Sequence, residues 1–236
     1  MEISYFRTHS KLFEIIWPRE ISLSILQEQL RVKAYLEKEY AEGIKEIRMG
    51  FNTLSLRLTK DISDKDCFDL VGEIKSSTLS VFEYQPKTWE IPVCYDEVFG
   101  KDLNNLSKIH KIPIEDLIHI HHSNLYTLHF YGFLPGFMYL GGLDARLFCP
   151  RKEKPDRLIP AGTVAIGGQQ TGIYPSDSPG GWHAIGKSPV KLFDIQQDPP
   201  CHAQVGDKIR FLPITKEKFY QIQKKVQNGQ YTLKHD

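Results

Sequence analysis

The sequence is poor in cysteine, and its cysteines form no local pattern. They lie far apart in the chain, at Cys67, Cys94, Cys149 and Cys201. This spacing excludes a metal-type cysteine pair and a compact disulfide framework. We expect reduced, mostly structural thiols. Cys149 stands beside Pro150-Arg151, but the sequence places no partner base next to it.

Charge of one sign and long apolar runs are also missing. Lys and Arg number 30 and Asp and Glu number 29, a formal net charge of +1, so no general attraction to nucleic acid or membrane is expected. No apolar run approaches the roughly twenty residues of a spanning helix. The opening MEISYFRTHSKLFEIIW lacks a basic segment followed by an apolar run, so we expect a cytoplasmic protein.

The remaining composition is that of a globular protein, with 41% apolar residues in 236, enough for one large domain or two modest ones. Residues 1–86 show the β-α-β-β-α-β order of a ferredoxin-like domain. A helical stripe starts at Ser24, which with Gln27 resembles a capping box, and ends at Gly43. The other predicted elements are short strands within 1–17, strands at 44–49, 54–58 and 79–84, and a helix at 64–75.

The segment Gln85-Pro86-Lys87 is the candidate boundary of a second domain over 87–236. Short strands and turn residues there predict a small closed or nearly closed barrel, and the whole chain is of the α+β class. The predicted elements are strands at 90–95, 126–130, 163–166, 183–185, 191–194 and 208–211, helices at 102–110 and 113–121, and a last helix that Thr215 opens.

Residues 130–186 concentrate Gly, Pro and aromatic side chains. Glycine allows a positive φ or the close approach of a ligand, and proline fixes a turn. The stretch therefore indicates rigid loops at which backbone N–H groups can face a ligand. Tight corners of the barrel are the alternative.

Several motifs of this stretch and its surroundings keep a family order and spacing. They are His121 with Tyr126, GFLPGFMYLGGL (132–143), Pro150-Arg151, PAGTVAI (160–166), TGIYP (171–175), SPGGWHAIG (178–186) and GDKIRF (206–211). Together they resemble the KipI / PxpB family, the B subunits of 5-oxoprolinase, also called allophanate hydrolase subunit 1. The resemblance implies a carboxy-terminal cyclophilin-like β-barrel. The chain departs from the family at Pro155-Asp156-Arg157, where the family reads Pro-Arg.

His121 and Arg151 are the predicted catalytic residues. His121 matches the family's histidine, which implies a general acid/base or a hydrogen-bond donor; a histidine satisfied at a helix end is the alternative. The planar fork of Arg151 suits a carboxylate or a phosphate. Its alternative is a loop-closing ion pair with Asp144 or Asp156. Arg157 could replace the family's displaced arginine.

Substrate contacts are expected from the same loops. Glycines would expose backbone N–H groups, Trp182 would form a wall, and tyrosines would supply hydroxyls. SPGGW is not a serine-nucleophile turn, because it lacks the Gly-x-Ser-x-Gly elbow. The predicted substrate-binding residues are Gly132, Pro135, Gly136, Tyr139, Gly162, Thr171, Tyr174, Ser178, Gly180, Gly181 and Trp182.

A metal site is not predicted, although His119, His121, His122 and His129 lie close in sequence. On a helix, His119 and His121 point roughly 200° apart, and no acidic residue completes a ligand set. A Walker loop is also missing. ATP use is therefore assigned to a complex, and whether ATP touches this chain stays open.

The resemblance implies a subunit of an ATP-hydrolysing 5-oxoprolinase, an amidohydrolase that opens 5-oxoproline to glutamate. The implied partners are a sister subunit of the PxpC/KipA type and a LamB/YcsF-like protein of the PxpA type, with no nucleic acid or membrane. The family name also covers a KipI-like inhibitor of a sporulation-type histidine kinase. A carboxyltransferase component of a urea carboxylase-like system is a further alternative.

Overall fold

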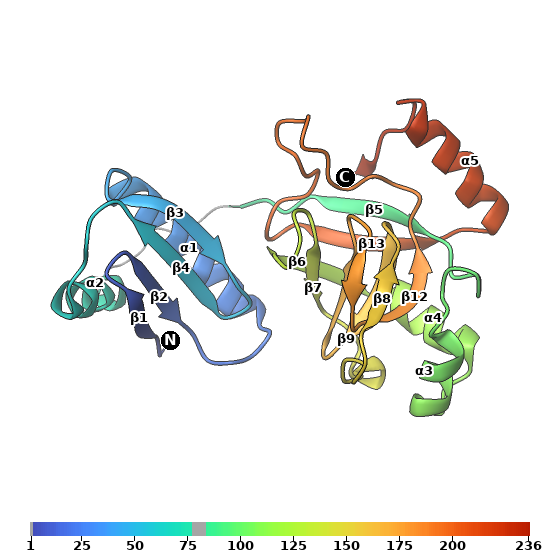
Figure 1. Cartoon of the computed structure of the whole chain (residues 1–236), viewed down its shortest axis with the longest axis horizontal. Helices are drawn as coiled ribbons and strands as arrows, with labels where there is room; N and C mark the ends of the chain where they lie inside the picture. The colour runs from blue at the N-terminus through green and yellow to red at the C-terminus, as the bar shows by residue number, and fades with distance from the viewer. Residues whose placement is uncertain (1, 77–83) are drawn as a thin grey trace. The chain divides into compact units, whose positions relative to one another are not determined.

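The structure is a computed structural model that describes residues 2–76 and 84–236. The chain divides into two compact units, Met1–Gln85 and Pro86–Asp236. Figure 1 draws the first in blue to teal and the second in green to red. No helix in the described part of the chain is both long enough and apolar enough to cross a membrane.

The first unit is an antiparallel sheet with two helices (Figure 1). Phe13 and Ile15 alternate along one strand, and both are fully buried, as expected for a sheet with one covered face. The elements are β1 (Ser4–His9), β2 (Leu12–Ile16), α1 (Leu23–Glu39), β3 (Ile44–Met49), β4 (Thr53–Leu58) and α2 (Asp64–Ser76), with the strands in the order β1-β2-β4-β3.

The strands predicted at 44–49 and 54–58 and the helix at 64–75 are confirmed to within a residue. The predicted capping box is wrong. The N-cap is Ser22, and Ser24 lies inside the helix with its hydroxyl 2.7 Å from that of Ser22. The strand predicted at 79–84 falls largely on 77–83, outside the described residues. In the described residues, β1 is the edge strand of this sheet and pairs with β2.

The second unit is a mixed sheet that closes on itself. Cys94 and Lys187 exchange two backbone hydrogen bonds of 2.9 Å, which join the segment after β5 to β12. The sheet contains, in spatial order, β12 (His183–Lys187), β9 (Thr163–Gly167), β10 (Gln170–Ile173), β7 (Met138–Gly141), β6 (Leu125–Tyr131), β13 (Lys208–Pro213), β5 (Thr88–Val93) and β14 (Lys234–His235).

Shorter elements complete this unit. Strands β8 (Asp156–Ile159) and β11 (Ser178–Gly180) pair separately, and the helices are α3 (Leu103–His110), α4 (Ile114–Ser123), α5 (Lys216–Gln227) and the 3-10 turn η1 (Ala145–Leu147). The strand predicted at 191–194 is wrong, because Phe193 makes only a single bridge with Cys201. Strands β7 and β10 were not predicted: each has only four residues and contains glycine.

The register of β7, β9 and β10 separates two faces of the closed sheet. Thr171 pairs with Leu140 and Ile166, on what we call the core face, because Leu140 and Ile166 belong to the unit's main hydrophobic core. The next residue, Gly172, pairs with Tyr139 and Ala165. Successive residues of a strand point to opposite faces, so this second row lies on what we call the pocket face.

Candidate functional site

The pocket face carries a pocket of about 260 Å³ in the Gly/Pro-rich stretch. It contains several of the predicted site residues: Tyr139, Arg151, Tyr174, Gly180, Gly181 and Trp182. It also contains four residues that are not among the predicted site residues: Phe133, Phe137, Pro155 and Pro179. A signal for the two phenylalanines was present, because both belong to the GFLPGF motif.

Arg151 is the cationic group of this pocket. Its guanidinium carbon lies 5.7 Å from the centroid of the Trp182 ring, a cation–π arrangement, and the guanidinium also hydrogen-bonds to the Tyr139 side chain. Asp144 pairs with Arg146 at 2.8 Å, and Asp156 pairs with Lys152 at 2.7 Å. Within the described residues, no carboxylate forms an ion pair with Arg151. The alternative of a loop-closing ion pair between Arg151 and Asp144 or Asp156 is therefore wrong.

The loop that carries Arg151 is anchored by the next residue. The Lys152 N–H donates to the Gly181 carbonyl at 2.7 Å. Its ammonium lies 2.6 Å from Asp102 and 2.7 Å from Asp156, and it is largely buried. These contacts hold the backbone of Arg151 against the SPGGW turn. Arg157 lies on β8, is exposed, and does not line the pocket.

Aromatic rings form the floor and one wall of the pocket. The Trp182 ring lies at nearly right angles to Phe137, with centroids 5.5 Å apart. Gly167 on β9 makes this position possible, because a Cβ there would lie 2.5 Å from the indole. Such edge-to-face packing fixes the rings without a polar partner. The pocket therefore has a rigid apolar surface.

The two tyrosines of the pocket stay protonated near neutral pH. Burial raises the pKa of Tyr174 to about 12. Burial also raises the pKa of Tyr139, although the Arg151 guanidinium opposes that shift. Both phenols can therefore donate a hydrogen bond but cannot act as a base at pH 7. Gly180 packs so closely against the Tyr174 hydroxyl that a Cβ there would overlap it.

His121 lies on the core face, away from this pocket. It is fully buried at the end of α4. Its Nε2 lies 2.9 Å from the Thr171 hydroxyl, and its Nδ1 lies 2.9 Å from the Tyr95 hydroxyl. The Thr171 hydroxyl donates to the Ala165 carbonyl at 3.0 Å, so we assign the proton of the imidazole to Nε2 and the acceptor role to Nδ1.

The electrostatics of His121 follow from this burial. Desolvation, with a smaller contribution from His122, lowers the pKa of His121 to about 3, so the ring is neutral at pH 7. The sequence predicts His121 and Arg151 in one site. The structure places His121 against the core face and Arg151 at the pocket face. A proton transfer from His121 into the pocket would have to cross the sheet.

The other predicted residues do not line the pocket. Thr171 holds His121, and Gly162 has a φ of 82°, where a Cβ would collide with the Ser188 carbonyl. Ser178 is buried in β11. Gly132, Pro135 and Gly136 form the turn before β7. These positions shape the framework around the pocket.

Metal-ligand groups do not assemble in the described residues: no three His, Cys, Asp or Glu side chains lie together. Cys149 and His183 come within 3.5 Å. His183 Nε2 also lies 2.9 Å from the Pro150 carbonyl, to which it can only donate. Burial raises the pKa of the Cys149 thiol, so this pair does not form an activated thiolate.

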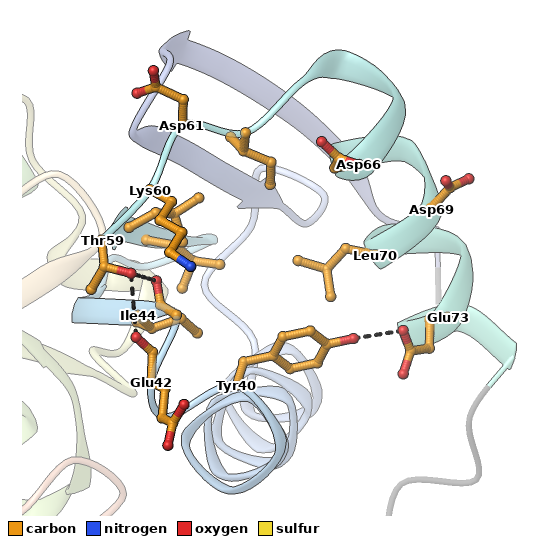
Figure 2. Close-up of a pocket in the computed structure, with 14 residues that line it drawn as sticks. Tyr40, Glu42, Ile44, Thr59, Lys60, Asp61, Asp66, Asp69, Leu70 and Glu73 are labelled. Carbon is orange, nitrogen blue, oxygen red and sulfur yellow. Dashed lines mark hydrogen bonds between the residues drawn. The ribbon is translucent and has the colours of Figure 1, made fainter.

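A larger groove, of about 860 Å³, lies in the first unit between the end of α1, strands β3 and β4, and α2 (Figure 2). Three of its carboxylates, Asp61, Asp66 and Glu73, already accept hydrogen bonds from their own unit. Glu73 accepts from Tyr40 at 2.7 Å, as Figure 2 shows, and also from Tyr35. Asp66 accepts from Ser63. Size alone therefore does not make this groove a reactive site.

Comparison with known proteins finds a family model and two curated relatives that each match most of the chain. A model of the carboxyltransferase domain, subdomain C and D, matches residues 1–203. The chain is 37% identical over 210 residues to the 5-oxoprolinase B subunit of Bacillus subtilis (strain 168), covering 83% of this chain and 85% of the relative. For the 5-oxoprolinase B subunit of Haemophilus influenzae the identity is 37% over 188 residues, covering 79% and 88%.

A more distant relative is urea amidolyase of Lachancea kluyveri, 28% identical over 186 residues, covering 70% of this chain and 10% of the relative. Among solved structures, PH0987 from Pyrococcus horikoshii is 36% identical with a TM-score of 0.55, covering 90% of this chain and 98% of that one. TTHA0988 is 28% identical with a TM-score of 0.71, and the match covers 90% of this chain but only 40% of TTHA0988.

The K. lactis urea amidolyase structure reaches a TM-score of 0.84 at 17% identity, covering 99% of this chain and 16% of that one. At this identity the likeness concerns the fold alone. It supports a mixed α+β architecture of the kind found in carboxyltransferase domains.

Proposed function

The chain belongs to the family of 5-oxoprolinase B subunits, and on this premise we propose that it is one component of an ATP-dependent 5-oxoprolinase. The complex would open the lactam of 5-oxoproline to give glutamate. The family name supports a role within a multi-subunit enzyme.

One observation carries this proposal. Arg151 lies at a small aromatic pocket, and no carboxylate within the described residues forms an ion pair with it. The carboxylate of 5-oxoproline would bind the Arg151 fork through two charge-assisted hydrogen bonds. The ring methylenes would lie against the aromatic surface. Tyr139 and Tyr174 would donate hydrogen bonds to the polar edge of the lactam.

Ring opening adds one water across the amide. The C–N bond breaks, the carbonyl carbon keeps the new oxygen, and the nitrogen becomes the amine of glutamate. ATP would first transfer its terminal phosphoryl group to the lactam oxygen and leave as ADP. One water would then add to that carbon as the C–N bond breaks, and a second water would release the phosphate and leave the carboxylate of glutamate. We assign ATP use to the complex, because the sequence contains no Walker loop.

His121 takes a positioning role in this proposal. Through Thr171 it fixes β10, and the next residue, Gly172, pairs with Tyr139 of the pocket. Because its pKa lies far below 7, it acts as a neutral hydrogen-bonding group. A group that handles the protons of the reaction would come from the substrate, from water or from a partner chain.

The partners we propose are a sister subunit of the PxpC/KipA type and a LamB/YcsF-like protein of the PxpA type. Arg151, Phe133 and Pro155 at the pocket are exposed, so a second protein could cover them and complete the site. For the fold, we propose that the first unit corresponds to a ferredoxin-like domain and the second to a cyclophilin-like barrel.

The test is an omission assay. The purified chain would be mixed with both candidate partners, ATP and 5-oxoproline, and glutamate would be measured with each component left out in turn. Glutamate formation that requires this chain would support the proposal. Full turnover without it would contradict the proposal. No turnover together with binding to a sporulation-type histidine kinase would support the inhibitor alternative.

The carboxyltransferase domain match supplies a second candidate function, the transfer of a carboxyl group. In this case Arg151 would hold a carboxylate that is transferred. A parallel assay of urea carboxylation, with a biotin carrier protein already charged with carboxybiotin, would separate the two. Carboxylated urea without glutamate formation would favour this second function.

A further inference from the structure

Phe133 has an unusual backbone conformation at the pocket. Its φ is 64°, in the left-handed region that bulky residues rarely adopt. The Leu134 N–H donates to the Gly132 carbonyl at 2.7 Å, so Phe133 stands at the apex of a three-residue γ-turn. A γ-turn with positive φ is rare and strained. Glycine would occupy this position without strain.

Core packing does not account for a phenylalanine here. The Phe133 side chain is 60% exposed, so it recovers little of the free energy that burial of an aromatic ring can supply. Its ring meets Phe137 and Tyr174 edge-to-face, with centroids 5.6 and 6.4 Å apart. Backbone strain that local packing does not offset is characteristic of functional sites.

The ring does contribute to the pocket that holds Arg151. Phe133 lies at 90° to the Phe137 ring, and Trp182 lies at 87° to the same ring. Phe133 and Trp182 thus both stand nearly perpendicular to Phe137, and Arg151 lies over the Trp182 ring. The pocket that these residues line combines one cation, Arg151, with the exposed ring of Phe133.

We propose that Phe133 is a specificity-determining residue that covers the apolar ring atoms of a small cyclic carboxylate. This inference rests on the proposed function and deepens it. Arg151 binds the carboxylate, and the Phe133 ring covers the methylenes and excludes water from that side of the lactam. The γ-turn aims the ring toward the ligand site, and the strain is the consequence of that orientation.

The experiment compares Phe133→Gly and Phe133→Leu with the wild type in the mixture with both partners at saturating ATP. Glycine adopts the positive φ without strain and removes the ring, whereas leucine keeps the strain and removes the ring. For both variants we expect the KM for 5-oxoproline to rise about tenfold, with a smaller change in kcat. We also expect reduced discrimination against the six-membered lactam carboxylate.

Thermal unfolding of the same variants separates function from packing. We expect the Tm of Phe133→Gly to equal or exceed that of the wild type, and the Tm of Phe133→Leu to fall below that of Phe133→Gly. Phe68 on α2 is 67% exposed and lies in the other unit, so Phe68→Leu is the matched control. This control should leave KM and the lactam discrimination unchanged.

The possible outcomes are distinct. Wild-type turnover with an unchanged KM and unchanged discrimination in Phe133→Gly would overturn the inference and leave the proposed function standing. A markedly lower Tm for Phe133→Gly would show that the ring serves packing, which also overturns it. If the wild type neither turns over 5-oxoproline in the mixture nor binds it in calorimetry, the proposed function fails, and the inference fails with it.

Discussion

The Nε2 atom of His121 lies 2.9 Å from the hydroxyl oxygen of Thr171, and this contact ties the end of α4 to strand β10 inside the closed sheet. It is one link in a relay. Tyr95 donates to His121, His121 donates to Thr171, and Thr171 donates to the Ala165 carbonyl. Every polar atom in the relay has a partner, as buried polar groups require.

Removal of the Thr171 hydroxyl should be costly. Thr171→Val keeps the side-chain shape but removes the hydroxyl that pairs with the His121 N–H and with one lone pair of the Ala165 carbonyl oxygen. We therefore expect the free energy of unfolding to fall by about 1–3 kcal/mol. Urea denaturation measures this. Thr8→Val, on an exposed position of β1, is the control and should stay within about 0.5 kcal/mol. Equal effects of the two substitutions would contradict the relay.

Burial of neutral His121 predicts a loss of stability in acid. The pKa of His121 is about 3 in the folded protein and about 6.5 in an unfolded chain. The unfolded state therefore binds more protons between these values, and stability falls as the pH drops below about 6.5. At pH 5 the loss from this group is of the order of 2 kcal/mol. Above about pH 8 the group makes no pH-dependent contribution, because it is then neutral in both states.

The measurement is the free energy of unfolding from pH 7 to pH 5 in the wild type and in His121→Gln. We expect the variant to be less stable at pH 7 but to lose less stability on acidification. The slope of its free energy of unfolding against pH should correspond to about one fewer proton bound on unfolding. His129, whose pKa burial lowers to about 4, adds a similar slope to both proteins. The same pH dependence in both proteins would refute this account.

Arg151 should control substrate binding. Arg151→Ala removes the only side-chain cation that lines the pocket within the described residues, so we expect the KM for 5-oxoproline to rise about 10- to 100-fold. Arg151→Lys should recover only part of this, because an ammonium lacks the planar fork. Arg157→Ala is the matched control and should leave KM unchanged. A larger effect at Arg157 than at Arg151 would reverse the assignment.

Gly167 should affect the pocket without touching a ligand. In Gly167→Ala the new methyl group would meet the Trp182 indole at 2.5 Å, so the indole must move. Arg151, which lies over this ring, would then lose its position at the pocket. We expect kcat/KM to fall at least about tenfold and stability to fall by about 1–3 kcal/mol. Activity assays and thermal unfolding test both. Wild-type kinetics in a folded Gly167→Ala protein would show that the wall is not required.

Gly72 offers the opposite case for a glycine-to-alanine substitution. It lies inside α2, is exposed, and a Cβ there would meet nothing within 4 Å. Alanine has the higher helix propensity, so Gly72→Ala should raise the free energy of unfolding by up to about 1 kcal/mol and leave activity unchanged. A decrease in stability would mean that α2 has a contact at this face that the geometry does not indicate.

Local patterns in the sequence determined much of the secondary structure. The helix at Asp64–Ser76 and the strand at Ile44–Met49 follow from periodicity, because one buried face repeats every 3.6 or 2 residues. The four-residue strands β7 and β10 are too short to show a period. Pairing with longer neighbours, rather than local propensity, makes them strands.

The same division holds for the site. The order of the Gly, Pro and aromatic motifs determined which family the chain belongs to and which loops build the pocket. Only the tertiary structure decided which side chains meet there. Thr171 and Gly172 are neighbours in sequence, yet strand geometry turns them to opposite faces, so His121 is drawn into the core while Tyr139 faces Arg151. The left-handed conformation of Phe133 could not be predicted from the sequence, because a phenylalanine rarely adopts a positive φ.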